Sequence, residues 1–563
     1  MPPKVQESFR EQMRSFPYAQ ILVLAFVRFA EPITFTSLFP YCYFMVRDFG
    51  VARTEAEVSV YSGYLSSIFA FFQMLMGFQW GRFADQYGRK PTIFIGLIGS
   101  IISSLILGFA GNYWWALFAR AVMGSLNGNV AVIRTMLGEV ATERKHQAIA
   151  FSVMPMIWQF GSIIGPLIGG YLSGNDTRYD FLRPLVTAHP YALPNITVAL
   201  FVLACLFVML FFLEETHFKH KYRHDYFVEI GDFILRVVFG VKPKDRPWHN
   251  TRSSLQSRFK NQSHSANEES PLLEEGDNTE DQPQPLYSQE ARRSVHRRPS
   301  NSSDDSIEGV GTVLSRRQSR ALVRAYSMHE EGDEDNASWS ELLTPAIFYA
   351  IVCSFIMALH MTVFEEFIPV FLAYEVARDE TGALASKFPF KISGGLGYTS
   401  EDTGALLSST GVLGVFLIVV VFPYIDRHYE SIATYRRFIS IFPFLYLVIP
   451  YVVFFADHPT ASHLVVYSIT CLKTLAVSMA NPQIFLIIHN CSPQKHRALV
   501  NGATISVNAL ARCVAPAVWG YLMTWGEKGN IAWLPWWSVV FLTLLSIYQA
   551  RFLRDSNDED EES

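Results

Sequence analysis

Twelve apolar runs, each long enough to cross a lipid bilayer, constrain the fold of this chain more than any other feature. A spanning helix needs about twenty mostly apolar residues, because the hydrocarbon core is roughly 30 Å thick and a helix rises about 1.5 Å per residue. Backbone groups in that layer find no water, so we expect the runs to be helices. They lie at approximately Ile21–Val46, Tyr61–Trp80, Pro91–Phe109, Trp114–Met136, Ile149–Leu172, Ile196–Leu213, Ile347–Leu372, Gly404–Phe422, Ile439–Phe455, Leu464–Ile488, Gly502–Leu522 and Trp536–Phe552.

Composition supports a membrane protein and argues against several other classes. Of the 563 residues, 50% are apolar and only 17% are charged, which is too apolar for an ordinary soluble enzyme. The six cysteines stand singly, so we expect packing residues and no metal site. No phosphate-binding glycine loop and no nucleophile elbow is present. We therefore expect no cofactor, no enzymatic activity, no nucleic-acid partner and no ATP-driven step.

Lysine and arginine in the short loops predict the orientation, because such loops stay on the cytoplasmic side. The loops after the second, fourth, eighth and tenth predicted helices carry basic clusters, whereas the third and ninth loops carry none. Both termini are therefore predicted to be cytoplasmic. The clusters are Arg82, Arg89 and Lys90; Arg144 and Lys145; Arg427, Arg436 and Arg437; and Lys495 and Arg497.

The chain changes character between its two sets of six runs. This middle segment is rich in Ser, Arg, Glu, Asp and Gln, so it cannot bury enough apolar surface to fold alone. We expect a largely disordered cytoplasmic linker that begins with an amphipathic stretch near Tyr226–Val237. The predicted organisation is a cytoplasmic segment at 1–20, a six-helix bundle at 21–215, the linker at 216–344, a second six-helix bundle at 345–553 and an acidic cytoplasmic tail at 554–563.

Two kinds of short motif lie in the linker. Ser300 and Ser319 each follow an Arg-Arg pair, as in sites of basic-directed kinases. Glu268, followed by Leu272 and Leu273, matches an acidic dileucine sorting signal, which adaptors recognise. Short motifs of this kind also arise by chance, so kinases and sorting adaptors are possible partners only.

An internal repeat relates the two halves. With an offset of 350 residues, Lys145–Leu172 and Lys495–Leu522 share seven identities in 28 positions. The loop before the fifth predicted helix and that helix itself thus recur at the eleventh. The repeat predicts an all-α membrane protein of twelve transmembrane helices in two parallel six-helix bundles, with a substrate site between them near the midplane.

Three motifs accompany this pattern. The loop after the second predicted helix combines an acid with a basic cluster and with glycines, which suit a turn or a close backbone approach. The fourth predicted helix contains Arg120 and Gly124, and the fifth contains a run of glycines with one proline. The loop motif consists of Gly81, Asp85, Gly88, Arg89 and Lys90, and the helix-five motif of Gly161, Gly165, Pro166, Gly169 and Gly170.

These motifs resemble the signatures of the major facilitator superfamily. Phe83, Gln86 and Met123 depart from the usual residues. The runs Arg28–Pro32 and Phe39–Tyr41 look like the zinc-induced-facilitator-like and fungal vacuolar branch, near the drug:proton antiporters.

The resemblance implies a role for each motif. In the family, the loop motif closes the cytoplasmic gate by pairing with neighbouring helices, which here would involve Asp85, Arg89 and Lys90. Asp426 and Arg427 look like a degenerate second copy. The helix-five motif marks proton-coupled antiporters. The alternative for the basic residues is that they only anchor the loop to lipid headgroups.

Ionisable residues inside the apolar runs are expensive, so each is a candidate for function. We expect Arg28 and Glu31 to pair along one helix. The carboxylates are candidates for proton or cation binding, with His360 as a titratable partner and Arg120 as a modulator of a carboxylate. The alternative is a set of static ion pairs or snorkelling side chains. The candidates are Arg28 and Glu31; Arg120, Asn127 and Arg134, spaced by seven as a polar stripe; His360, Glu365 and Glu366; and Lys473, with Arg512 nearby.

Together these features predict a secondary transporter of a small solute, exchanging it for protons by alternating access. A vacuolar or lysosome-like membrane is favoured, with the plasma membrane as the alternative. The charges allow a cationic or zwitterionic solute, and the aromatic residues Tyr41, Phe44 or Trp158 could line its pocket. The rival hypothesis is a non-transporting sensor that signals through the linker.

Overall fold

The structure is a computed structural model that describes residues 16–141, 144–174, 182–217, 220–240, 344–492 and 497–553. These ranges are mostly helical, and their only bridges between extended segments are three isolated pairs. Most of the linker lies outside the described residues, including Glu268, Leu272, Leu273, Ser300 and Ser319. The same holds for most of the first segment and for the acidic tail.

Every predicted apolar run lies on helical structure. Within the described residues, nine helical stretches are long and apolar enough to cross a membrane. The remaining runs lie on α8, whose apolar part is Met156–Leu172, and on α21 and α22. The first-half elements are α2 (Tyr18–Thr36), α3 (Cys42–Asp48), η1 (Glu55–Glu57), α4 (Val58–Tyr87), α5 (Arg89–Gly108), α6 (Tyr113–Leu126), α7 (Asn129–Val140), α8 (Arg144–Leu172), α9 (Arg183–Ala188), α10 (Ala192–Phe212) and α11 (Tyr226–Phe239).

The second half repeats this plan with different interruptions. Its eighth predicted span contains a π-helical turn, and its ninth is built from three short pieces, two of which begin at a proline-containing turn. The elements are α15 (Pro345–Ala373), α16 (Ser400–Phe416), η3 (Leu417–Val421), α17 (Phe422–His428), α18 (Ser431–Ile439), α19 (Phe442–Val448), η4 (Ile449–Phe455), α20 (Pro459–Cys491), α21 (Arg497–Lys528), α22 (Trp533–Gln549) and η6 (Ala550–Phe552).

The fourth predicted span is broken, which corrects the expected polar stripe. α6 ends at Leu126, and Asn127 and Gly128 separate it from α7. The Trp80 indole packs against the break: it donates to the Ser125 carbonyl at 2.7 Å, and a Cβ on Gly128 would lie 2.3 Å from its ring. Arg120, Asn127 and Arg134 therefore do not share one helical face. The first span is likewise divided, by a turn at residues 37–41.

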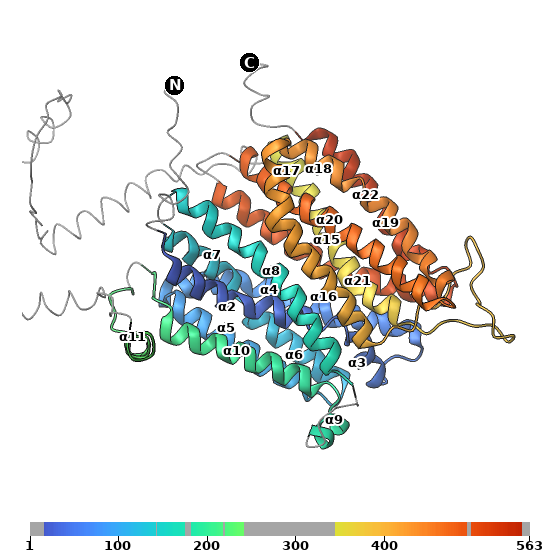
Figure 1. The fold of residues 1–563 in the computed structure, drawn as a ribbon, viewed down its shortest axis with the longest axis horizontal. Helices are drawn as coiled ribbons and strands as arrows, with labels where there is room; N and C mark the ends of the chain where they lie inside the picture. Colours follow the sequence, from blue (N-terminus) through green and yellow to red (C-terminus); the bar gives the residue numbers. More distant parts are fainter. Residues whose placement is uncertain are drawn as a thin grey trace, which may run out of the picture. The chain divides into compact units, whose positions relative to one another are not determined.

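The helices form two groups, seen in Figure 1 as the blue-to-green and the yellow-to-red elements. The groups meet along two helix pairs, α4 against α21 and α8 against α16. α8 and α21 are the helices that contain the 350-residue repeat. α8 and α21 therefore occupy equivalent positions, because each packs against a helix of the opposite bundle.

The two ends of these bundles differ. We call the end with Asp85 and α11 the motif end, and the opposite end, with residues 374–399, the far end (Figure 1). At the far end the bundles are joined by Ser59 and Tyr374, whose hydroxyl oxygens lie 2.5 Å apart, and by Lys528 and Glu57 at 2.6 Å. Further hydrogen bonds join the bundles between the far end and the middle, from Ser66 to Glu366 and from Ser408 to the Ile163 carbonyl. In this state the bundles are thus joined at the far end.

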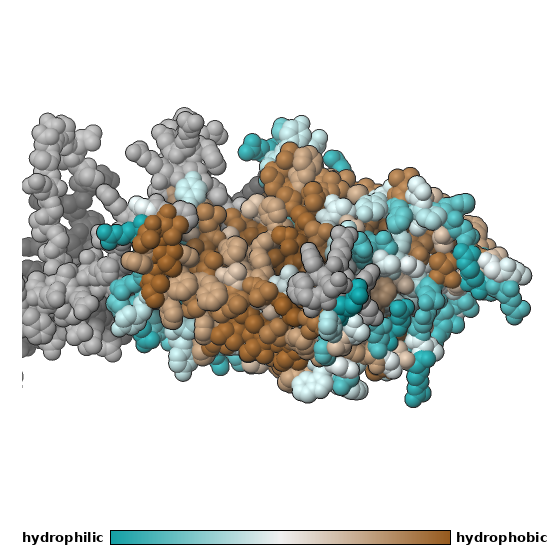
Figure 2. Space-filling view, turned by 60° about the horizontal axis from the view of Figure 1, so that its bottom comes forward, coloured by the Kyte–Doolittle hydropathy of each residue, from teal (hydrophilic) through white to brown (hydrophobic). Residues whose placement is uncertain are grey.

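The outer surface has the pattern of a membrane protein. Figure 2 shows apolar side chains in a broad brown band and hydrophilic atoms collected at the right-hand end of the visible face. Large apolar side chains such as Leu200, Phe444 and Phe541 are 60%, 71% and 69% exposed. Exposed apolar surface of this extent marks contact with another apolar medium, here lipid.

Candidate functional site

Two adjoining cavities lie within the bundles and share the walls Phe35 and Phe69. The first is lined by residues of the first bundle, among them Arg28 and Glu31. The second is lined from both bundles, with Glu366 and Arg512 contributed by the second bundle. The second cavity therefore lies between the bundles, where the substrate site is predicted.

Arg28 and Glu31 form the ion pair that their spacing on α2 predicts. Their side chains are only 9% and 13% exposed. The Arg28 Nε atom is buried and has no hydrogen-bond partner. Glu31 is thus neutralised by a neighbour on its own helix.

The adjacent residues Glu365 and Glu366 of α15 have different partners, because consecutive helical residues point about 100° apart. Glu365 lies 3.3 Å from the Lys473 ammonium on α20, within its own bundle. Glu366 accepts a 2.5 Å hydrogen bond from the Ser66 hydroxyl on α4, across the bundle boundary. Among the described residues no cation forms an ion pair with Glu366.

Arg120 lies on α6 and is 1% exposed. Its guanidinium stacks on the Phe69 ring at 4.6 Å, and its Nε atom donates to the Leu65 carbonyl at 3.2 Å. One terminal nitrogen, Nη2, has no partner. Among the described residues no carboxylate forms an ion pair with Arg120, but the charge of Glu366 reaches it through space.

His360 lies inside the second bundle and not beside the carboxylates. Its Nδ1 atom lies 2.9 Å from the Tyr446 hydroxyl, and its ring packs on Phe442. The side chain is 2% exposed. This position fits a packed core histidine better than the predicted titratable partner.

None of the predicted aromatic residues Tyr41, Phe44 and Trp158 lines either cavity. Tyr41 is not among the lining residues, because it accepts a hydrogen bond from Asn195 and stacks on Tyr191. Phe44 lies near the far end beneath the Arg47 guanidinium. The walls are Phe35 and Phe69, and Trp158 packs behind Phe35 with ring centres 5.9 Å apart.

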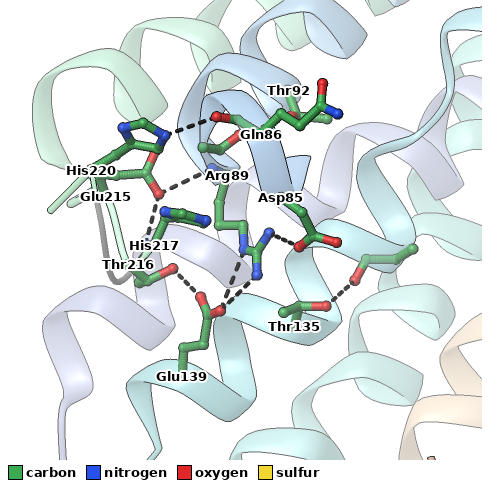
Figure 3. Close-up of polar contacts among 12 residues, drawn as sticks. Asp85, Gln86, Arg89, Thr92, Thr135, Glu139, Glu215, Thr216, His217 and His220 are labelled. Carbon is green, nitrogen blue, oxygen red and sulfur yellow. Dashed lines mark hydrogen bonds and ion pairs between the residues drawn. The ribbon is translucent and has the colours of Figure 1, made fainter. Parts of the chain in front are cut away.

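At the motif end, Arg89 forms the centre of a charged network (Figure 3). It donates to Asp85 at 2.5 Å and to Glu139 at 3.0 and 3.3 Å. Glu139 also accepts from Thr216. The network ties α4, α5 and α7 to the segment after α10, all within the first bundle.

Glu215 caps the start of α5. Its two carboxylate oxygens accept from the backbone N–H groups of Arg89 and Lys90, each at 3.0 Å, where a helix N-terminus favours negative charge. Gly88 is required here because it has φ +112° and because a Cβ would lie 2.6 Å from Glu215. Gly81 differs from the prediction: it lies within α4, and a Cβ there would meet nothing within 4 Å.

Lys90 connects the loop motif to α11. Its ammonium lies 2.6 Å from Asp225 and donates to the Leu210 carbonyl at 2.8 Å. Asp225 also caps α11 by accepting from its first backbone N–H groups. Near Arg89, burial and then the Arg89 charge lower the pKa of His217, so this imidazole is neutral at pH 7.

The second copy of the motif is built differently. Asp426 accepts a 2.9 Å hydrogen bond from Gln483 on α20. Arg427 is exposed, and the two residues form no ion pair with each other. The resemblance to the first copy is thus limited to position.

The helix-five glycines bring α8 into contact with α2. A Cβ on Gly161 would meet Pro32 at 2.4 Å, one on Gly165 would meet Thr36 and one on Gly169 would meet the Ser37 carbonyl. Gly170 instead faces α16 of the other bundle, where a Cβ would lie 2.8 Å from the Gly404 Cα atom. Each glycine is therefore needed for close packing, and α8 runs through Pro166 without a break.

Sequence reasoning missed four partners: Ser66, Glu139, Glu215 and Asp225. The three acids lie at helix ends beside the basic loop motif, and acidic residues contribute little to the charge signal that predicts topology. The nearness of these acids to the basic motif was the signal that could have identified them as its partners. The sequence contains no such signal for Ser66, because a single serine on a long helix is common.

The comparisons with known proteins decide the family. Residues 24–516 match the model of the Major Facilitator Superfamily. The chain belongs to this superfamily. It is therefore a multi-pass membrane transporter for small molecules and not an enzyme.

Relatives and solved structures agree with this assignment. The transporter is 31% identical over 553 residues to the major facilitator superfamily multidrug transporter mfsB of Aspergillus fumigatus, covering 97% of this chain and 85% of that one. It is 25% identical to the protein zinc induced facilitator 1 of Arabidopsis thaliana, covering 96% and 91%. A D-xylose-proton symporter has the same fold, with a TM-score of 0.57 at 10% identity and 96% and 99% coverage.

Proposed function

We propose that this transporter exchanges a small solute for protons by alternating access, and that Glu366 carries the proton. The observation behind this is the hydrogen bond from Ser66 to Glu366 across the bundle boundary. Glu31 and Glu365 are each neutralised by a basic residue, whereas Glu366 is not. Burying a carboxylate without a cation is costly, and protonation removes that cost.

This argument links protonation to conformation. A protonated Glu366 favours the present state, in which the far halves of the bundles enclose it. An ionised Glu366 favours exposure to water, which opens the far end and closes the motif end. Proton release on one side and uptake on the other would thus drive the cycle.

The motif end supplies the gate in this proposal. Arg89 holds Asp85 within the first bundle, yet the Asp85 side chain is 70% exposed. Closure would bring this carboxylate to the second bundle, while Glu139 keeps Arg89 in place. Bending of α8 near Pro166 would accompany the movement.

The proposed setting is a vacuolar or lysosome-like membrane, with the motif end and both termini in the cytoplasm. The basic loops and the dileucine pattern at Leu272 and Leu273 support it. Phosphorylation of the linker would be a further control. Imaging of a Leu272→Ala/Leu273→Ala protein tests the setting, which is wrong if delivery to an acidic compartment is unchanged.

The direct test is solute-driven proton movement in sealed vesicles that contain the purified transporter. Substrates found by a screen with an imposed pH gradient should move protons in the wild type. Glu366→Gln should abolish the proton movement, and Glu365→Gln should keep it if the protein folds. Unchanged proton movement in Glu366→Gln protein would show that another group carries the proton.

A further inference from the structure

α11, at the motif end, is a short amphipathic helix with defined ends. It contains 14 residues, whereas a helix needs about twenty to cross a membrane. The Asp225 side chain caps its start by accepting from the backbone N–H groups of Phe227 and Val228. Gly240, with φ +66°, ends it in the left-handed conformation. The sequence therefore makes α11 an element of its own and not the continuation of a span.

One side of α11 is fixed to the first bundle. Val228 is fully buried, and a Cβ on Gly231 would lie 2.0 Å from the Phe211 carbonyl oxygen of α10. Asp225 pairs with Lys90 at 2.6 Å. Figure 1 shows α11 nearly end-on while α10 runs across the view, so α11 lies across the end of α10. These contacts set both the direction of α11 and its rotation about its own axis.

A second side of α11 is apolar and exposed. Its large side chains recur at intervals of four, three and four residues, which places them on one helical face. Tyr226, Phe233 and Val237 are 72%, 66% and 66% exposed. The charged residues of α11 lie on a third side, in contact with neither the apolar residues' face nor the bundle side of the helix. We call the following residues the apolar face of α11: Tyr226, Ile230, Phe233 and Val237.

Phe227 connects the apolar face to the outer surface of α10. Its ring packs on Phe211 with ring centres 6.2 Å apart, and Phe211 stacks on Phe207. Phe207 is half exposed and belongs to a helix long and apolar enough to cross a membrane. The apolar surface that contacts lipid on α10 therefore continues onto α11.

We propose that α11 lies in the surface of the bilayer at the motif end, with its apolar face among the acyl chains of the lipids. An amphipathic helix in this position buries its apolar face about 5–10 Å into the boundary between headgroups and acyl chains. The bundle side of α11 then contacts α10, and the charged side faces water and headgroups.

The charges of α11 and of the segment before it indicate that apolar insertion, and not attraction to anionic lipid, holds the helix there. Residues 221–240 contain three basic and three acidic side chains, so three positive charges minus three negative charges leave none. We therefore expect α11 to insert equally well into a neutral bilayer. The six residues are Lys221, Arg223 and Arg236, and Asp225, Glu229 and Asp232.

Insertion has a consequence for the loop motif. Asp225 begins α11 and pairs with Lys90, and Lys90 follows Arg89 at the start of α5. A helix held in the bilayer surface thus fixes the start of α5 at the level of the headgroups. This anchoring does not depend on proton exchange.

Spin-label accessibility tests the inference in the full chain, reconstituted into phosphatidylcholine vesicles. In a chain without its native cysteines, Phe233→Cys and Val237→Cys each carry a nitroxide on the apolar face, while the other three residues of that face remain. Collisions with oxygen, which concentrates among acyl chains, are compared with collisions with nickel ethylenediaminediacetate, which stays in water. Arg236→Cys, at an exposed charged position, is the matched control, and Leu200→Cys, 60% exposed on α10, is the reference for lipid contact.

We expect the labels at 233 and 237 to collide mainly with oxygen, at a ratio that corresponds to a depth of about 5–10 Å. The label at 236 should collide mainly with the nickel complex, and its oxygen-to-nickel ratio should be several-fold lower. Addition of phosphatidylglycerol should leave the depth unchanged. A Tm close to that of the parent chain shows that each labelled protein is folded.

Three results would overturn the inference. Nickel collisions at 233 and 237 as frequent as those at 236 would place the apolar face in water. Few collisions with either reagent would place protein over it, and broadening between labels would then distinguish a second copy from residues 241–343. A depth that appears only with phosphatidylglycerol would mean that lipid charge, and not apolar insertion, holds α11 at the membrane.

Discussion

The motif ends of the two bundles are fastened in different ways. In the first bundle, Arg89 bridges two carboxylates, and Lys90 binds a third. In the second bundle, Arg436 donates to the backbone carbonyls of Ala550 and Leu553 at 2.8 and 3.0 Å. The repeat has thus kept the positions of the helices but not the chemistry that joins their ends.

This difference indicates which bundle can provide the residues that close the motif end. An ion-pair network can exchange partners when a new charge approaches, whereas bonds to backbone carbonyls fix one arrangement. The exposed Asp85 is part of an ion-pair network that could exchange partners in this way. Asp426, bonded to the neutral Gln483, has no such network around it.

The largest expected effect follows from Arg89→Gln. This change leaves Glu139, which is 29% exposed, without its cation, and breaking a largely buried pair on one side costs about 3 kcal/mol. Thermal unfolding in detergent should begin several degrees lower, and transport should be lost. Arg437→Gln is the matched control. Wild-type stability of Arg89→Gln would show that the network is not structural.

Asp85→Asn should separate stability from gating. The Asp85 side chain is 70% exposed, and an exposed ion pair contributes about 0–1 kcal/mol, so Tm should hardly change. Transport should nevertheless fall at least about tenfold if Asp85 closes the motif end, which corresponds to about 1.4 kcal/mol. Normal transport would restrict the motif to anchoring the loop.

Asp426→Asn should have the smallest effect. The amide oxygen of asparagine can still accept from Gln483, so stability should change by less than about 0.5 kcal/mol. Transport should stay near the wild-type rate. A loss as large as that of Asp85→Asn would mean that the two motif ends act alike, and the comparison would fail.

Much of the fold followed from sequence patterns. Apolar runs located the helical segments, because membrane spans obey a length rule, and the 350-residue repeat identified α8 and α21 as equivalents. The breaks were not predictable in this way. The interruption at Gly128 packs against the Trp80 ring, which lies 48 positions earlier in the chain and meets it only after α4 and α6 pack.

The sequence predicted which charged residues belong to the site but not which residue each of them contacts. Arg28 and Glu31 pair along one helix, so their spacing sufficed. Glu365 with Lys473 and Glu366 with Ser66 pair across helices, where sequence distance carries no information. Adjacent carboxylates consequently looked the same in the sequence and differ in the structure.

Spin labels on the motif ends test the central claim most directly. In a chain without its native cysteines, labels at Thr135→Cys on α7 and Tyr424→Cys on α17 report the separation of the bundles there. The account predicts longer distances in acid than at neutral pH for the wild type and for Glu365→Gln. Glu366→Gln, which mimics the protonated carboxyl, should show the long distances at both pH values. A Glu366→Gln protein that responds to pH like the wild type would contradict the account.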